Sequence, residues 1–143
     1  MESNNNELST IISNLQKQGK MNFVPKACEV LIRAFEVRNG ITLPLKYKEW
    51  LLFSDGGEFF LPAGVQMYGV AHKPLIDVSY DDKPNGNYIV IGALASGDPV
   101  LCEKSGERIS IYDHEAGRIE DDETFQDFFD FLNKLGNTLV IGD

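Results

Sequence analysis

Carboxylates and an imidazole stand side by side in the triplet Asp113-His114-Glu115. Such groups bind a metal or move protons when they converge on one point. Neighbours on a strand point to opposite faces, so this triplet predicts a solvated turn and not a metal site. The second histidine, His72, has no partner that the sequence reveals, and we expect a surface or capping role for it. We therefore predict no catalytic residue and no metal ligand.

The remaining patterns of enzymes and cofactor-binding proteins are missing from the sequence. Gly56-Gly57 and Gly97 stand in neither a G-x-x-x-x-G-K-[ST] nor a G-x-G-x-x-G pattern. No serine lies in G-x-S-x-G. Cys28 and Cys102 are far apart and away from both histidines, which favours free thiols over a zinc site or a disulfide. We expect no cofactor and no enzymatic activity.

The charge of the chain is strongly negative and unevenly distributed. The formal net charge is −9 and the sequence pI is about 4.6. Residues 1–50 carry seven Lys and Arg against five Asp and Glu, whereas residues 51–143 carry six against seventeen. Such a field repels nucleic acid and anionic lipid and attracts basic proteins. The alternative is that the acidic surface only keeps the protein in solution.

Two segments combine the residue types expected at a protein-binding site. Tyr80, Asp81 and Asp82 belong to a polar segment at residues 77–87, and a tyrosine supplies large contact area at low entropic cost. Asp113 and Glu115 add carboxylates for steering a basic partner. We predict these five residues as partner-binding; an ordinary solvated loop is the alternative for residues 77–87. A further acidic run at residues 120–123 is expected to favour the positive N-terminal end of a helix after it.

The length of 143 residues suits one domain with one core. The longest apolar runs are far shorter than the roughly 20 residues that cross a bilayer. The N-terminus is acidic and rich in amides, unlike the basic and then apolar start of a secretory signal. We therefore expect a cytoplasmic protein that does not interact with membranes; its oligomeric state stays open.

The first third of the sequence has the apolar spacing of helices. Leu8, Ile11, Ile12 and Leu15 form a stripe that predicts a helix over residues 7–19. A second helix is predicted from about Pro25 to Asn39. Its core face is expected to hold Ala27, Val30, Leu31, Ala34 and Phe35. A third helix is expected to begin at Pro44 and to bury Tyr47, Trp50, Leu51 and Ser54.

The middle of the chain has the pattern of strands. Short β-branched and aromatic runs bounded by Gly, Pro and Asp predict antiparallel strands at residues 58–61, 65–70, 88–92, 99–102 and 108–112. A last helix is predicted over residues 124–135, with Thr124 as N-cap and Gly136 as its end. Residues 138–141 are open between a short edge strand and a loosely docked end.

Several motifs, in the same order, resemble those of the SUKH superfamily, which includes yeast cell-wall synthesis regulators and bacterial immunity proteins against secreted toxins. The resemblance covers about residues 25–135 and is carried by residues 40–51, 54–57, 67–69, 88–92, 96–100 and 124–129. They supply a Leu-Pro followed by an aromatic residue, a polar-Gly-Gly turn, a Tyr-Gly strand end, a strand followed by a Gly-Asp turn, and a Thr-Phe-x-x-Phe helix. Residues 93–95 depart from it, because many relatives have a polar residue there.

The resemblance implies an α+β fold in which a curved antiparallel sheet packs against N-terminal helices and one C-terminal helix. It also implies a protein-binding role: an immunity protein that neutralises a toxin domain with a basic surface, such as a nuclease. An intracellular adaptor of the cell-wall regulator type is the alternative, and the lack of the long flanks that those regulators carry favours immunity.

Overall fold

The computed structural model describes residues 2–59, 64–78, 88–113 and 115–141. Four helices and seven strands are found in this part of the chain. The helices are α1 (Glu2–Gln18), α2 (Glu29–Asn39), α3 (Leu45–Leu51) and α4 (Phe128–Ile141). The strands are β1 (Met21–Asn22), β2 (Gly57–Phe59), β3 (Val65–Met67), β4 (Tyr88–Leu94), β5 (Pro99–Glu103), β6 (Ile109–Asp113) and β7 (Arg118–Phe125).

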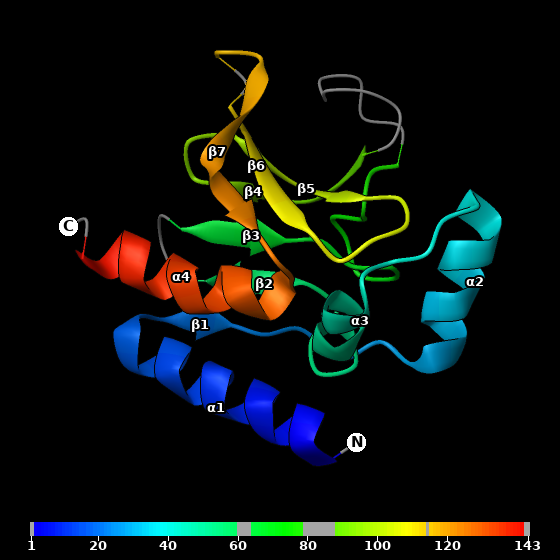
Figure 1. The fold of residues 1–143 in the computed structure, drawn as a ribbon. Coiled ribbons are helices and arrows are strands. Elements are labelled where there is room, and N and C mark those ends of the chain that lie inside the picture. The colour runs from blue at the N-terminus through cyan, green and yellow to red at the C-terminus, as the bar shows by residue number, and fades with distance from the viewer. Residues whose placement is uncertain (1, 60–63, 79–87, 114, 142–143) are drawn as a thin grey trace.

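The sheet is an antiparallel meander in which the strands lie in their chain order, from β1 to β7. Helices α1, α3 and α4 lie together on one side of it, and α2 stands at its margin (Figure 1). The predicted α+β class, with N-terminal helices and one C-terminal helix packed on an antiparallel sheet, is confirmed. No helix in the described ranges is both long and apolar enough to cross a membrane.

The core lies between the sheet and these three helices. The stripe predicted on α1 is buried at Leu8, Ile11 and Leu15, as the i, i+3, i+7 spacing requires. Helix α3 buries Tyr47 and Trp50 completely, and the Trp50 ring meets neighbouring aromatic rings edge to face. The strands complete the core with alternate residues, chiefly Ile89, Ile91, Val100, Cys102, Ile109 and Ile111.

Helix α2 buries a different face from the one predicted. It begins at Glu29 and not at Pro25, because the preceding residues are bonded to the end of α3: the Ala27 N–H donates to the Leu51 carbonyl at 2.9 Å. The helix packs through Ile32, Phe35 and Glu36. Val30 and Val37 are consequently 76% and 68% exposed, and Leu31 and Ala34 are also exposed. Of the predicted core face, only Ala27 and Phe35 are buried.

The last helix begins later and extends further than predicted. Thr124 is held in β7, opposite Ser110 of β6, so it does not cap the helix. Asp127 caps it instead, with its Oδ1 accepting the Asp130 N–H at 2.8 Å. The helix runs through Gly136 to Ile141, which rules out an edge strand at residues 138–141. Strand β7 contains the acidic run at residues 120–123, so the predicted placement of that run at a helix N-terminus is wrong.

Candidate protein-binding surface

The sheet face turned away from the main core carries a small apolar cluster of its own. Side chains alternate along a strand, so Val90, Leu101 and Tyr112 lie opposite the core-facing residues of their strands. They are buried, with Tyr68, Tyr88 and Ile119 packed around them as half-buried neighbours. We call these six residues the outer sheet cluster. The tyrosines give this face large amphipathic side chains of the kind enriched at protein interfaces.

The predicted site residues Asp113 and Glu115 lie in the turn between β6 and β7. Asp113 Oδ1 accepts the main-chain N–H of Glu115 and of Ala116, both at 3.0 Å, which makes an Asx-type turn. Gly117 follows with a φ of +73°, a conformation that suits glycine. Asp113 is therefore half-buried and shapes the turn, while Glu115 is exposed and available to a partner.

Strand β7 forms the open edge of the sheet on this side, and its pairing is interrupted at the acidic run. Ser110 pairs with Thr124 and Tyr112 with Ile119, so residues 120–123 stand opposite the single residue Ile111. Three extra residues are thus inserted in the edge strand, more than the single extra residue of an ordinary β-bulge. Four consecutive acidic residues at a bulged edge also oppose pairing with another strand. We name Asp113, Glu115 and residues 120–123 the acidic hairpin.

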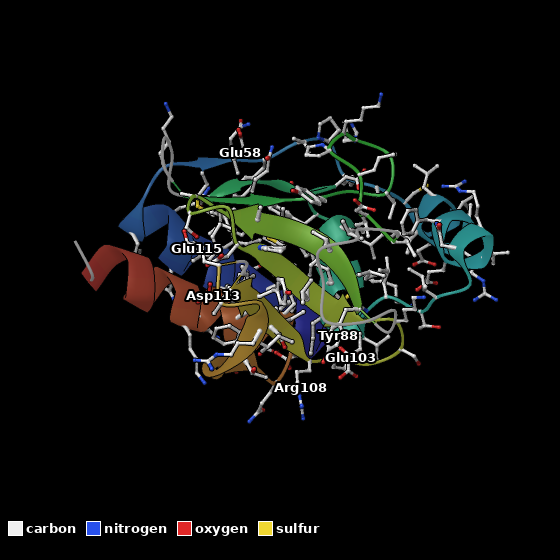
Figure 2. All side chains as sticks on the ribbon, turned by 90° about the horizontal axis from the view of Figure 1, so that it is seen from above. Glu58, Tyr88, Glu103, Arg108, Asp113 and Glu115 are labelled. Atoms are coloured by element: carbon white, nitrogen blue, oxygen red, sulfur yellow. The ribbon has the colours of Figure 1, made fainter. Side chains whose placement is uncertain are left out.

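The other predicted site residues, Tyr80, Asp81 and Asp82, lie outside the described residues. Tyr88, which opens β4, pairs with Glu103, and Arg108 lies beside Glu103 across the β5–β6 turn. Asp113, the last residue of β6, is five residues after Arg108, so the two lie roughly 16 Å apart at about 3.3 Å per residue. Figure 2 shows Tyr88, Glu103 and Arg108 at one end of the sheet and Asp113 and Glu115 at the other. Tyr88 and the turn at Asp113 and Glu115 therefore lie at opposite ends of one sheet.

A buried carboxylate holds the segment that follows β3. Asp55 is 1% exposed, and its side chain accepts the N–H groups of Val70, Ala71 and His72 at 2.8, 2.9 and 2.8 Å. The His72 ring nitrogen Nδ1 lies 3.3 Å from Asp55 Oδ2. Gly69 has no side chain, and a Cβ there would stand 2.6 Å from the Asp55 carboxyl carbon.

This Asp–His pair resembles those that orient catalytic bases, but its carboxylate is already the acceptor of three main-chain groups. The pair thus anchors the loop that follows β3.

Two ionisable groups of the core, Tyr47 and Cys102, have raised pKa values. Burial is the main cause that raises the pKa of the Tyr47 hydroxyl and of the Cys102 thiol well above their ordinary values. The Tyr47 hydroxyl donates to the Tyr68 carbonyl. Cys102 is a free thiol, as is the exposed Cys28. Among the described residues, His, Cys, Asp and Glu form no group of three that suits a metal ion. The described surface thus offers tyrosine side chains on the outer sheet face and carboxylates at the turn after β6.

Sequence reasoning missed two parts of this surface. The strand β7 was overlooked because four successive acidic residues are unfavourable in strands, and the pairs with β6 on either side of the run place it there. The position of Tyr88 on the outer face was not recognised, although its spacing of two residues from Val90 is the signal that places both on one face.

Comparison with known proteins adds one finding. The model of the SMI1 / KNR4 family (SUKH-1) matches residues 26–134, which is most of the chain. No curated protein matches the chain significantly.

Proposed function

The chain belongs to the SMI1 / KNR4 family (SUKH-1), and on that premise we propose that it is a non-catalytic, protein-binding immunity protein. Its partner in this proposal is a toxin domain with a basic surface, such as a nuclease, which it blocks in the cytoplasm. The predicted SUKH resemblance is confirmed by the family match, while the immunity role is our inference from the surface.

The observation that carries the proposal is the acidic hairpin. It sets the exposed Glu115 and the run at residues 120–123 on the open edge of the sheet, in the part of the chain where acidic residues outnumber basic ones by eleven. A nuclease needs basic surface to hold phosphates, and an acidic inhibitor meets that surface with opposite charge. Such complementarity raises the association rate and suppresses wrong partners.

The test is co-expression with the protein encoded beside this gene, followed by pull-down and a toxicity rescue assay. We expect a toxic neighbour to be bound and neutralised, with an affinity that falls as salt rises. Glu115→Lys should slow association about two- to tenfold at low salt. Glu29→Lys, the same charge change on α2, is the matched control and should leave the rate nearly unchanged. A harmless or unbound neighbour contradicts the immunity role.

The proposal retains Tyr80, Asp81 and Asp82 as partner-binding residues. Substituting Tyr80 by Ala tests contact area, and substituting Asp81 and Asp82 by Asn tests steering. If the toxin contacts Asp81 and Asp82 as well as the acidic hairpin, its association rate should depend less on the salt concentration in the two Asn variants. An unchanged affinity in all three would remove residues 80–82 from the site.

The second candidate is an intracellular adaptor of the cell-wall regulator type. It is favoured by the outward face of α2, where Val30, Ala34 and Val37 are exposed at i, i+4, i+7 spacing and Arg33 and Arg38 flank them. An adaptor needs two separate surfaces, and α2 stands apart from β7 in Figure 1. A partner whose binding is lost in Val30→Asp and retained in Glu115→Lys would support this function over immunity.

A further inference from the structure

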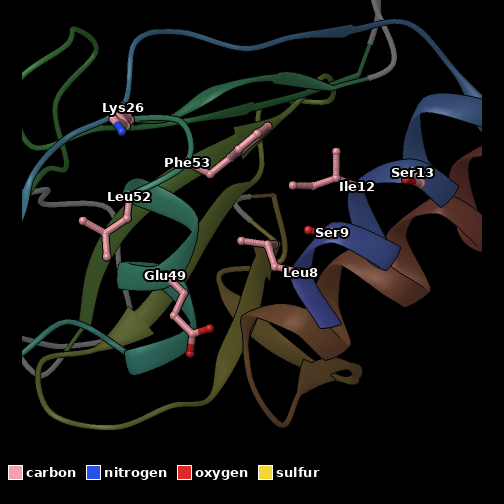
Figure 3. A pocket seen from close by; sticks show the side chains of 8 residues that line it. All are labelled: Leu8, Ser9, Ile12, Ser13, Lys26, Glu49, Leu52 and Phe53. Carbon is pink, nitrogen blue, oxygen red and sulfur yellow. The ribbon is translucent and has the colours of Figure 1, made fainter. Parts of the chain in front are cut away.

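A groove runs between α1 and the end of α3, on the helical side of the molecule (Figure 3). Its volume is about 530 Å³. The apolar lining comes from Leu8 and Ile12 of α1 and from Leu52 and Phe53, which follow α3. Leu52 and Phe53 are 37% and 38% exposed, although large apolar side chains next to a core are usually covered.

Glu49 of α3 also lines this groove, and its carboxylate is poorly paired. Its Oε1 is buried and has no hydrogen-bond partner in the part of the chain that the structure describes. Its Oε2 lies 4.0 Å from the Lys46 ammonium, at the outer limit of an ion pair. Buried polar oxygens are almost always hydrogen-bonded in native proteins, because an unmade bond destabilises the fold, and more so for a charged group.

The nearby cations do not satisfy this oxygen. The Lys46 ammonium is shared, because it lies 3.8 Å from Glu7 Oε1 and 4.8 Å from the centre of the Phe129 ring. Lys26 is exposed and lines the groove, and in Figure 3 it lies at the end away from Glu49. The groove thus combines an apolar lining with one carboxylate that lacks a donor.

The hollow between α2 and α3 borders the same carboxylate. Glu49 and Leu52 line both hollows, so they form the ridge between them. The exposed Leu45 lies in the second hollow. A partner segment that lies along α3 would therefore cover three exposed apolar side chains, Leu45, Leu52 and Phe53, while it passes over Glu49.

We propose that the groove between α1 and α3 binds a protein segment that presents an arginine or lysine beside apolar side chains, with the Glu49 carboxylate as acceptor for the cation. The apolar part of the segment covers Leu52 and Phe53, and its cation supplies the donor that Glu49 lacks. The incoming cation meets the carboxylate on the side that lines the groove, where the Lys46 ammonium lies only at 4.0 Å from Oε2. This site is separate from the acidic hairpin, and it does not rest on the immunity role.

The chemistry of the site is tested with a small probe that joins an apolar group to a cation. We would titrate 4-phenylbutylamine into the ¹⁵N-labelled protein and follow the amide resonances. Leu8, Ile12, Leu52 and Phe53 should shift, with the uncharged 4-phenylbutanol binding at least fivefold more weakly. Glu49→Gln should weaken the amine to the level of the alcohol, whereas Glu115→Gln, the same change at an exposed remote position, should leave it unchanged.

Equal binding of amine and alcohol, shifts elsewhere on the surface, or an unaffected Glu49→Gln variant would overturn the proposal. The same resonances shifting when the protein alone is concentrated would assign the groove to a second copy and would also overturn it. Because this titration needs no biological partner, its failure leaves the acidic hairpin proposal standing.

A second measurement separates a binding role from a structural one. If Glu49 serves a ligand, the free protein carries an unsatisfied carboxylate, and replacing it with an apolar side chain of similar length should raise stability. Glu49→Met should therefore raise the thermal midpoint by about 2–4 °C while it abolishes selective binding of the amine. A lowered midpoint would show that Glu49 supports the fold, and it would contradict the proposal.

Discussion

Asp55 offers the sharpest test of how this fold is held together. Its carboxylate accepts three main-chain N–H groups from Val70, Ala71 and His72, at distances of 2.8 to 2.9 Å. Asp55→Asn preserves the shape and removes the charge. One oxygen remains, so the side chain can still accept either the Val70 N–H or those of Ala71 and His72, but not all three. Its new NH₂ group must face at least one N–H that has lost its acceptor.

The size of the effect follows from these contacts. One buried N–H left without an acceptor costs about 1–3 kcal/mol, and the remaining bonds weaken as their acceptor loses its charge, by roughly 1–2 kcal/mol together. Asp55→Asn should therefore lower the free energy of unfolding by about 2–5 kcal/mol. A small domain has about 5–15 kcal/mol in total, so most of this range leaves a folded protein.

Denaturation in urea, followed by Trp50 fluorescence, measures this loss. Trp50 is the single tryptophan and is completely buried, and its Nε1 donates to the Gly56 carbonyl at 2.9 Å, next to Asp55. Hydrogen exchange adds a local readout, because the amides of Val70, Ala71 and His72 should lose protection.

Asp113→Asn is the matched control. It keeps the one oxygen that accepts both N–H groups of its turn, so it should cost less than about 0.5 kcal/mol. A loss below about 1 kcal/mol in Asp55→Asn, or equal losses in both variants, would refute the reasoning.

Three further outcomes are expected. In the native protein a thiol reagent should modify Cys28 alone, because Cys102 is buried and its pKa is raised, and both should react after unfolding; two reactive native thiols would contradict this. Stability should fall above about pH 9, since the folded protein keeps the protons of Cys102 and, higher still, of Tyr47 while the unfolded chain releases them; each contributes at most about 1.4 kcal/mol per pH unit. A flat profile in urea titrations from pH 8 to 10 would show that burial does not hold the Cys102 proton. Glu36→Ala should lower the free energy of unfolding by about 2–4 kcal/mol, because the buried carboxylate accepts the Leu43 N–H at 2.8 Å and pairs with Lys48 at 3.0 Å; denaturation that leaves the midpoint unchanged would argue against that role.

Local patterns in the sequence were sufficient to predict the elements that have a single apolar face to bury. Helix α1 has a single apolar stripe, so Leu8, Ile11 and Leu15 face the core. Helix α3 and the strands β4, β5 and β6 were also predicted from local patterns. Helix α3 ends at Leu51 with Leu52 as its C-cap, and Gly56 and Gly57 take the positive φ values of the turn that leads into β2. Spacing and turn chemistry act within a few residues, which is why the sequence is sufficient there.

Tertiary structure decided the orientation of α2. This helix has apolar residues on two faces, Val30 and Val37 on one and Ile32 and Phe35 on the other. The side that packs is also the side on which Glu36 meets Lys48 and the Leu43 N–H. These partners come from α3 and the segment before it, so periodicity within α2 does not reveal the choice.

The surfaces that support function depend on tertiary structure for the same physical reason. The sequence correctly marked the turn at Asp113 and Glu115 as carboxylate-rich, because that is a property of neighbouring residues. It did not show that the acidic run belongs to a bulged edge strand, which pairing with β6 determines. The groove beside Glu49 joins helices about forty residues apart in the chain. Composition and spacing thus established the charge and the elements with one clear apolar pattern, whereas long-range packing decided the edge strand β7 and the surroundings of Glu49.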